Sequence, residues 1–231
     1  MRLYLNEVFI MKLIANALIK YLSGLVLVGG LLFLPAGTVA YPGAWRFMAL
    51  PFLPMLVLGV VLLVKAPALL QKRLSVKEKE GAQRGVIGLS ALVFVAGFVV
   101  AGLDFRFGWS RVPPVAVWIA AAVFLVAYGL YAEVMRENAY LSRTVEVQEG
   151  QRVVNTGLYG VVRHPMYLAA SLLFLALPVV LGSWWALAVF GAFPLLLVVR
   201  IHNEERVLTR ELPGYEDYTK KVRYRLVPFI W

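Results

Sequence analysis

The chain has 231 residues, of which 61% are hydrophobic, and it carries a formal net charge of +10. This hydrophobic fraction exceeds the roughly 45–50% of soluble domains, which excludes an ordinary soluble protein and predicts a single membrane domain over residues 1–231. The sequence contains no cysteine, which excludes disulfides, thiolate metal sites and a cysteine nucleophile. The cations lie between apolar runs, so they indicate membrane topology and not a nucleic-acid surface.

Apolar runs predict an all-α, polytopic integral membrane protein with about six transmembrane helices. Residues 1–20 predict a short interfacial helix that leads into the first run. The runs cover residues 14–34, 47–64, 86–103, 114–133, 166–181 and 184–199. Because a crossing needs about 20 apolar residues, the last two runs are short for a span. They predict a helical hairpin that turns at Gly182 and Ser183.

The basic residues are divided unequally between the two ends of these runs. Twenty Lys and Arg residues lie in the N-terminal segment, residues 65–85, residues 135–165 and the C-terminal tail, against three on the opposite side. The positive-inside rule therefore predicts that both termini are cytoplasmic, in an inner membrane of bacterial type or its equivalent.

Residues 135–165 form the longest polar connection. Within it, residues 144–148 and 151–154 alternate in character around Glu149 and Gly150, which predicts a small β-hairpin. No internal repeat and no Gly-x-Gly-x-x-Gly nucleotide loop occur in the chain.

Two polar clusters lie at the cytoplasmic ends of apolar runs. Residues 163–167 read Arg-His-Pro-Met-Tyr, and Pro165 fits the first turn of a helix because it lacks an amide donor. The free amide groups at such a helix start favour an anion. The second cluster reads Arg-Ile-His-Asn-Glu-Glu and places Arg200 and Glu204 on one helical face. Glu205 lies about 100° further round, so we expect it to be the more expendable carboxylate.

Each of these residues has a structural interpretation beside a functional one. Arg200 and Glu204 can form an ion pair at the helix end, or they can face an anionic group and a cation or proton of a ligand. Tyr159 and Tyr167 can be interfacial anchors or can line a site. His164 is one of two histidines, and their spacing is not that of metal ligands, so no metal site is predicted.

The ordered set of these residues resembles the membrane-embedded isoprenylcysteine carboxyl methyltransferases and their phospholipid methyltransferase relatives. The resemblance covers roughly residues 144–229, whereas residues 1–135 match only in being N-terminal transmembrane helices. It rests on Gly-Leu-Tyr at 157–159, Arg-His-Pro-Met-Tyr at 163–167, Glu-Glu at 204–205, and Tyr-Glu-Asp-Tyr with Val-Arg-Tyr-Arg-Leu-Val-Pro at 215–228.

The resemblance implies an S-adenosylmethionine-dependent methyltransferase whose catalytic half, residues 136–231, carries a cytoplasmic cap. The substrate would be a lipid or a prenylated carboxylate or headgroup at the cytoplasmic face of the bilayer. Arg200 falls where the family places an arginine that engages the lipid substrate, so Arg200 and Glu204 are the implied catalytic residues. The implied cofactor-binding residues are Gln151, Arg152, Val153, Val154, Tyr159, His164, Pro165, Met166, Tyr167 and Glu204.

Other functions stay open on the sequence alone. Membrane reductases that use NADPH on sterols or enones look similar around Arg-His-Pro-x-Tyr. A third possibility is a small transporter or a structural membrane subunit, which would carry ionisable residues along its spans. The first three apolar runs contain almost no ionisable residues, and this argues against an ion pathway. The longer acidic run of the eukaryotic family members is only Asn203, Glu204 and Glu205 here, so the roles of these Glu residues do not follow from the resemblance alone. No feature identifies a prenylated-protein partner, so the acceptor itself is not identified.

Overall fold

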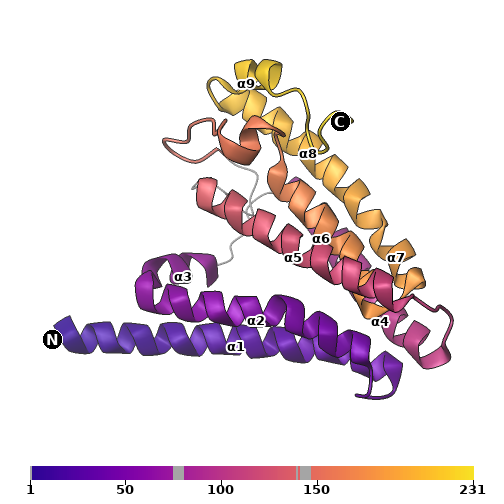
Figure 1. Cartoon of the computed structure of the whole chain (residues 1–231). Helices are drawn as coiled ribbons and strands as arrows, with labels where there is room; N and C mark the ends of the chain where they lie inside the picture. The colour runs from indigo at the N-terminus through magenta and orange to yellow at the C-terminus, as the bar shows by residue number, and fades with distance from the viewer. Residues whose placement is uncertain (1, 75–80, 139, 141–146) are drawn as a thin grey trace.

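The computed structural model describes residues 2–74, 81–138, 140 and 147–231, and within them the chain is helical and without strands. The first part contains α1 (Arg2–Ala36), α2 (Pro42–Lys65), α3 (Pro67–Leu74), α4 (Gly81–Phe107) and α5 (Pro114–Glu137). The second contains a short 3₁₀ turn η1 (Gly157–Gly160), α6 (Pro165–Leu181), α7 (Trp184–Phe190), α8 (Ala192–Glu211) and α9 (Tyr215–Lys221). Figure 1 shows long helices packed together and a cap of shorter segments at one end of α6 and α8. The all-α prediction is confirmed.

Several of these helices are long and apolar enough to cross a bilayer. They are Phe9–Ala36, Pro42–Lys65, Gly88–Phe107, Pro114–Glu137 and the combined Trp184–Glu211. Helix α6, with 17 residues, is a shorter apolar helix. At 1.5 Å per residue it reaches only about 25 Å, less than the ~30 Å of a hydrocarbon core. The chain is therefore a multi-pass integral membrane protein, as predicted.

Several helices extend beyond the predicted apolar runs; α4, for example, covers Gly81–Phe107 where residues 86–103 were predicted. Helix α1 is continuous from Arg2, so the predicted interfacial helix and the first span are one element. The sequence also predicts that the second arm of the hairpin ends at Val199, but α8 runs on to Glu211 because its polar residues continue the helix beyond the apolar run. Gly191 separates α7 from α8, and Pro194 contributes to this break because it has no amide donor.

The hairpin itself forms where the sequence predicts it. Gly182 ends α6 with a left-handed φ of 86°, a conformation that a residue without a Cβ adopts easily. Ser183 begins α7 as its N-cap, and its side chain accepts a hydrogen bond of 3.0 Å from the amide of Ala186. The turn thus reverses the chain in two residues.

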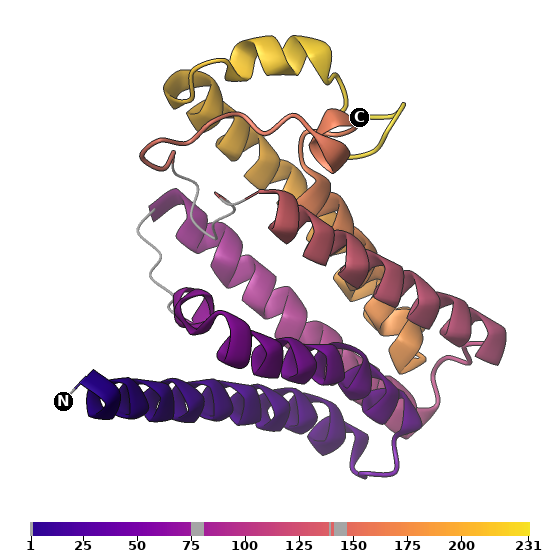
Figure 2. The ribbon, with the colours of Figure 1, turned by 60° about the vertical axis from the view of Figure 1, so that its left-hand side comes forward.

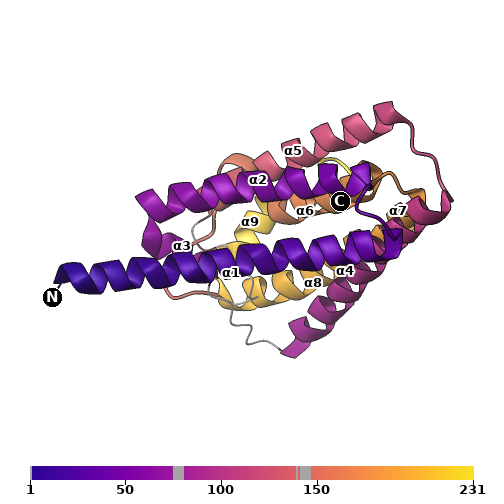
Figure 3. The same cartoon turned by 90° about the horizontal axis from the view of Figure 1, so that it is seen from below.

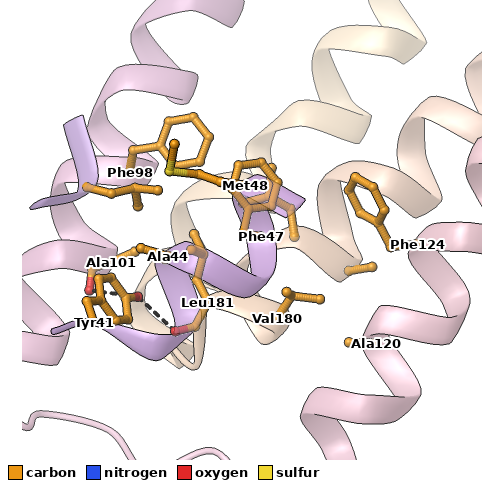
Figure 4. Packing of buried hydrophobic residues seen from close by; sticks show 14 of the residues in the cluster. Tyr41, Ala44, Phe47, Met48, Phe98, Ala101, Ala120, Phe124, Val180 and Leu181 are labelled. Atoms are coloured by element: carbon orange, nitrogen blue, oxygen red, sulfur yellow. Dashed lines mark hydrogen bonds between the residues drawn. The ribbon is translucent and has the colours of Figure 1, made fainter. Parts of the chain in front are cut away.

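The main hydrophobic core lies between α1, α2, α4, α5 and the α6–α7 hairpin. Phe47, Phe98 and Phe190 are among its buried side chains, and Phe98 packs edge-on to Phe190 with ring centroids 5.8 Å apart. The Tyr41 hydroxyl donates a 2.8 Å hydrogen bond to the carbonyl of Leu181, which joins the start of α2 to the end of α6 (Figure 4). This core fixes α6, whose other end carries the polar cluster Arg163–Tyr167.

The cap lies at one end of the helices. Figure 2 shows residues 147–164, the end of α8, α9 and the C-terminal segment gathered around the start of α6. Seen from below in Figure 3, α1 and α2 lie side by side on the face of the bundle away from α9. The polar clusters at both ends of the α6–α8 hairpin are therefore brought to the same end of the molecule.

Candidate functional site

One wall of the site is anchored by the end of α5. The Glu137 carboxylate accepts hydrogen bonds from the Thr156 hydroxyl (2.8 Å) and the Leu158 amide (3.2 Å), which holds η1 against α5. Gly157 has a positive φ of 46°, and a Cβ at this position would overlap the Glu137 carboxylate. The positive φ therefore favours glycine at the start of the Gly-Leu-Tyr-Gly turn, and any larger residue would also displace the Glu137 carboxylate.

Tyr159 is fixed from two sides. Its hydroxyl accepts a 2.9 Å hydrogen bond from the Asn138 side-chain amide, and its carbonyl accepts one of 2.7 Å from the Tyr218 hydroxyl. Burial raises the pKa of Tyr159 to about 12, and burial likewise raises the pKa of Tyr218. Both phenols are therefore neutral at pH 7 and take part as hydrogen-bonding groups.

The start of α6 is tied to the C-terminal segment. The amide of Arg163 donates to the carbonyl of Tyr224 (2.9 Å), and the amide of His164 donates to the carbonyl of Arg225 (2.8 Å). Pro165 opens the helix as predicted, but the amide of Tyr167 donates to the His164 carbonyl at 3.0 Å. The prediction that this helix start offers a row of free amide groups to an anion is therefore wrong, because neighbouring carbonyls already bind most of them.

Glu205 is the centre of a buried ionic cluster. Its carboxylate accepts hydrogen bonds of 2.7 Å from the Nε atoms of Arg163 and Arg225, and His164 Nε2 lies 3.2 Å from it. Arg163 also donates to the carbonyl of Val222 at 2.8 Å. The side chains of Arg163 and Glu205 are only 7% and 12% exposed, so these charges are paired away from solvent. Glu205 thus joins α8, the start of α6 and the C-terminal segment, which argues against the expectation that it is the more expendable of the two carboxylates.

Glu204, its neighbour, points to different partners. The Tyr167 hydroxyl donates to the Glu204 carboxylate, and Arg200 Nε donates a 2.9 Å hydrogen bond to that same hydroxyl. Tyr167 therefore links Arg200 and Glu204, and the Arg200 guanidinium also lies 5.8 Å from the Tyr167 ring centroid. The prediction that Arg200 and Glu204 share one helical face, with Glu205 turned away from it, is confirmed.

These groups surround a cavity that encloses about 830 Å³ of empty space, including its open mouth. All of the predicted site residues except Pro165 line it, so the cavity joins Gln151, Arg152, Val153, Val154, Tyr159, His164, Met166, Tyr167, Arg200 and Glu204. Pro165 starts α6 behind this wall. The structure brings the predicted residues to one place, while their roles stay predictions.

The cavity also contains residues that the sequence does not single out as site residues. They are Asn138, Tyr140, Arg163, Leu208, Leu212, Tyr215 and Tyr218. Tyr215 and Tyr218 belong to the Tyr-Glu-Asp-Tyr stretch, whose spacing places both rings on the inner side of α9. Their spacing in this stretch is the sequence feature from which both could have been predicted as site residues. Leu208 and Leu212 carry no such signal, because leucine at the end of a helix is an ordinary core residue.

The segment Gln151–Val154 runs along the cavity without regular secondary structure. The predicted β-hairpin falls partly outside the described residues, and the described part, residues 147–154, forms a turn at Glu149 and Gly150 but no strand. Backbone groups of Gln151–Val154 are thus not committed to a sheet, and they border the cavity.

The types of side chain that line the cavity fit the chemical groups of S-adenosylmethionine. Aromatic rings offer faces for an adenine, Glu204 suits an ammonium or sulfonium, and Arg152 and Arg200 suit a carboxylate. The Tyr215 hydroxyl is buried and has no hydrogen-bond partner among the residues that the structure describes. A ligand with several hydrogen-bonding groups fits a wall that holds an unsatisfied hydroxyl, since buried polar groups are normally bonded.

A metal ion needs a particular arrangement of ligating side chains. No group of three or more His, Asp or Glu side chains lies close enough together in the described part of the chain to hold a metal ion. His164 is held by Glu205 and stacks on Tyr167 with ring centroids 5.6 Å apart.

Comparison with known proteins agrees with the position of the cavity. Residues 115–213 match the family model described as phospholipid methyltransferase. This range extends from α5 to the turn before α9 and includes all of the predicted site residues. A 91-residue stretch is also 31% identical to the delta(14)-sterol reductase of Mus musculus, and it covers 38% of this chain and 22% of that relative. The chain thus spans about a fifth of the length of the reductase that it matches.

Proposed function

We propose that this chain, whose residues 115–213 belong to the phospholipid methyltransferase family, is an S-adenosylmethionine-dependent membrane methyltransferase. The observation that carries the proposal is that the family match and the cavity coincide: Tyr167, Arg200 and Glu204 lie in both. The acceptor is a lipid or a prenylated small molecule, taken at the end of the molecule where the cap meets the bilayer.

The cavity residues bind and orient the donor in this proposal. S-adenosylmethionine, when bound, supplies a methyl group activated by its sulfonium. Tyr159, Met166 and Tyr167 exclude water from the reacting centre, and Glu204 holds the positively charged part of the ligand. Alignment and exclusion of water are the main requirements of a direct displacement, and together they contribute several orders of magnitude in rate.

The role of Arg200 and Glu204 toward the acceptor depends on its charge. A carboxylate acceptor is already ionised at pH 7, so Arg200 needs only to orient it. An ammonium headgroup must first lose a proton, and Glu204, bonded to the Tyr167 hydroxyl, is the base within reach. A comparison of the two acceptor classes therefore determines what Glu204 does.

A labelled-methyl assay tests the activity. The purified protein in detergent is incubated with S-adenosylmethionine labelled in its methyl group and with either a total lipid extract or prenylcysteine analogues. We expect transfer into one acceptor class, with roughly a hundredfold loss in Glu204→Gln and Tyr167→Phe. Glu216→Gln on the exposed face of α9 is the matched control and keeps full activity. Transfer that is absent for both acceptor classes overturns the proposal.

The likeness to the sterol reductase favours a second candidate, an NADPH-dependent reduction of a sterol or enone. Ligand-induced thermal stabilisation separates the two, because a ligand that binds only the folded state raises its melting temperature. S-adenosylhomocysteine stabilises the protein if the methyltransferase proposal is right. Stabilisation by NADPH and not by S-adenosylhomocysteine selects the reductase.

We also propose that both termini and the cavity lie on the cytoplasmic side of an inner membrane of bacterial type or its equivalent, as the distribution of basic residues predicts. The chain has no native cysteine, so single-cysteine variants report topology directly. Lys220→Cys in α9 should be protected in sealed right-side-out vesicles from a membrane-impermeant maleimide, and Arg111→Cys before α5 should react. The reverse pattern contradicts this orientation.

A further inference from the structure

A second groove lies between the first halves of α2 and α5, far along these helices from the candidate site. It encloses about 670 Å³ of empty space, which includes its open side. Its lining is apolar except for one cation and consists of Arg46, Ala49, Leu50, Leu53, Pro54, Trp118, Ala121 and Leu125. The candidate site, by contrast, lies beyond the last turn of α5, at Asn138.

Arg46 is the unusual residue of this groove. Its Nε is buried and has no hydrogen-bond partner among the described residues. A buried charged donor without an acceptor is costly, because it has lost water and gained no bond in return. Arg106 and Arg111, the other cations on this side of the chain, are both exposed. Arg46 as a whole is partly exposed, so the groove holds a positive charge that a ligand can reach and whose Nε donor has no partner among the described residues.

Along the groove, a cation and a tryptophan come first and leucines follow, which is the order of the phosphate and the acyl chains in a phospholipid. Arg46 lies four residues after Pro42, and Trp118, which is 66% exposed, lies four residues after Pro114. Both are one turn inside their helices, the depth at which arginine and tryptophan meet lipid headgroups. Leu53 and Leu125 lie seven residues further along, about 10 Å deeper.

We propose that this groove binds an anionic phospholipid of the leaflet opposite the candidate site. The phosphate accepts hydrogen bonds from the Arg46 guanidinium, and one acyl chain lies along Leu50, Leu53 and Leu125. A guanidinium binds phosphate through two parallel hydrogen bonds, which gives the contact both strength and direction. The site does not depend on the methyl-transfer proposal, because it involves none of the cavity residues.

Lipid titration by native mass spectrometry tests whether the charge of Arg46 selects an anionic lipid. The protein in detergent is titrated with dioleoyl phosphatidylglycerol or with dioleoyl phosphatidylcholine, which have the same chains. We expect the wild type to bind the anionic lipid roughly tenfold more tightly. Arg46→Gln should abolish this preference, and Arg106→Gln, which removes an exposed charge from the same side, should retain it. A preference that survives in Arg46→Gln, or that falls equally in both variants, overturns the proposal.

Fluorescence quenching tests the position of the chain. Phosphatidylglycerol with brominated acyl chains quenches tryptophans that it contacts, and Trp118→Phe subtracts the contribution of Trp118. We expect Trp118 to be quenched at lower lipid concentration than the remaining tryptophans, and Arg46→Gln should shift its quenching to about tenfold more lipid. Quenching of Trp118 that is no stronger than that of the other tryptophans also overturns the proposal.

Discussion

A largely enclosed carboxylate lies beside each end of α6, Asp104 of α4 at the hairpin end and Glu205 of α8 at the cap end, but their surroundings differ. At the hairpin end, Asp104 is 1% exposed and accepts hydrogen bonds from the Ser110 amide (2.8 Å) and from the hydroxyls of Ser110 and Ser183. Asp104 borders neither the candidate cavity nor the lipid groove. At the cap end, Glu205 is less completely enclosed, with 12% of its side chain exposed, while Glu204 faces a cavity.

This difference shows that a buried carboxylate is not by itself a sign of function. Asp104 and Glu205 have several bonded donors each, and they connect segments that are distant in the sequence. Glu204 has a hydroxyl partner and open space beside it, which leaves room for a ligand. We therefore expect substitutions of the enclosed carboxylates to change stability and substitutions of Glu204 to change activity.

The largest loss of stability is expected for Glu205→Gln. The change leaves the charges of Arg163 and Arg225 without their counter-ion, and breaking a buried ion pair costs about 3–5 kcal/mol. The melting temperature in detergent should fall sharply, and limited proteolysis should cleave the C-terminal segment. The exposed Glu216→Gln is the control. A melting temperature equal to that of this control contradicts the fastening role.

Asp104→Ala should have the next largest effect. It leaves the buried hydroxyl of Ser183 and the amide of Ser110 without their acceptor, a cost of about 2–3 kcal/mol. Because Asp104 is remote from the cavity, the affinity of the folded variant for S-adenosylhomocysteine should stay within about twofold of wild type. If Asp104→Ala lost much of its affinity for S-adenosylhomocysteine while its stability stayed unchanged, the structural role of Asp104 would be contradicted.

Ser183→Ala should cost less, about 1–2 kcal/mol, because it removes the N-cap of α7 and one of the bonds to Asp104. The double variant with Asp104→Ala measures whether these losses share one interaction. We expect the double variant to be less destabilised than the sum of the single variants. Simple additivity argues against a direct contribution of the Ser183–Asp104 bond.

The smallest change in stability is expected for Glu204→Gln, below about 0.5 kcal/mol, since the amide oxygen still accepts from the Tyr167 hydroxyl and the cavity can hydrate it. Activity, in contrast, should fall strongly. The same measurements on Glu205→Gln make the two neighbouring residues a matched pair. If Glu204→Gln is as unstable as Glu205→Gln, Glu204 belongs to the structural cluster and not to the site.

Local patterns in the sequence identified the helices and the hairpin turn. The apolar runs are as long as the bilayer requires, and Gly182 and Ser183 end one helix and begin the next through their own backbone and side-chain properties. The extent of α8 was not predictable in this way. Polarity marks where a span leaves the hydrocarbon, but a helix can continue in water, so α8 reaches Glu211.

Several bonds that shape the site join residues that are far apart in the sequence. Arg163 and Glu205 are 42 positions apart, and the Tyr218 hydroxyl binds the Tyr159 carbonyl across 59 positions. Helical periodicity separates Glu204 from Glu205 by about 100°, but it does not say which of them meets a cavity. The sequence also does not show the structural contacts of Glu205, because its partners come from the start of α6 and from the C-terminal segment.

By itself, the sequence determined the class of the protein, its apolar helices and the hairpin turn, because hydrophobicity, helix period and turn residues act over a few neighbouring positions. Ten of the residues that line the cavity were implied by the resemblance to a family, and the others were not singled out as site residues. The tertiary structure alone decided which charges are paired, which carboxylate borders open space, and that the Nε of Arg46 is buried without an acceptor among the described residues. These properties depend on burial and on partners brought together by packing, and neither is encoded in the local pattern around a residue.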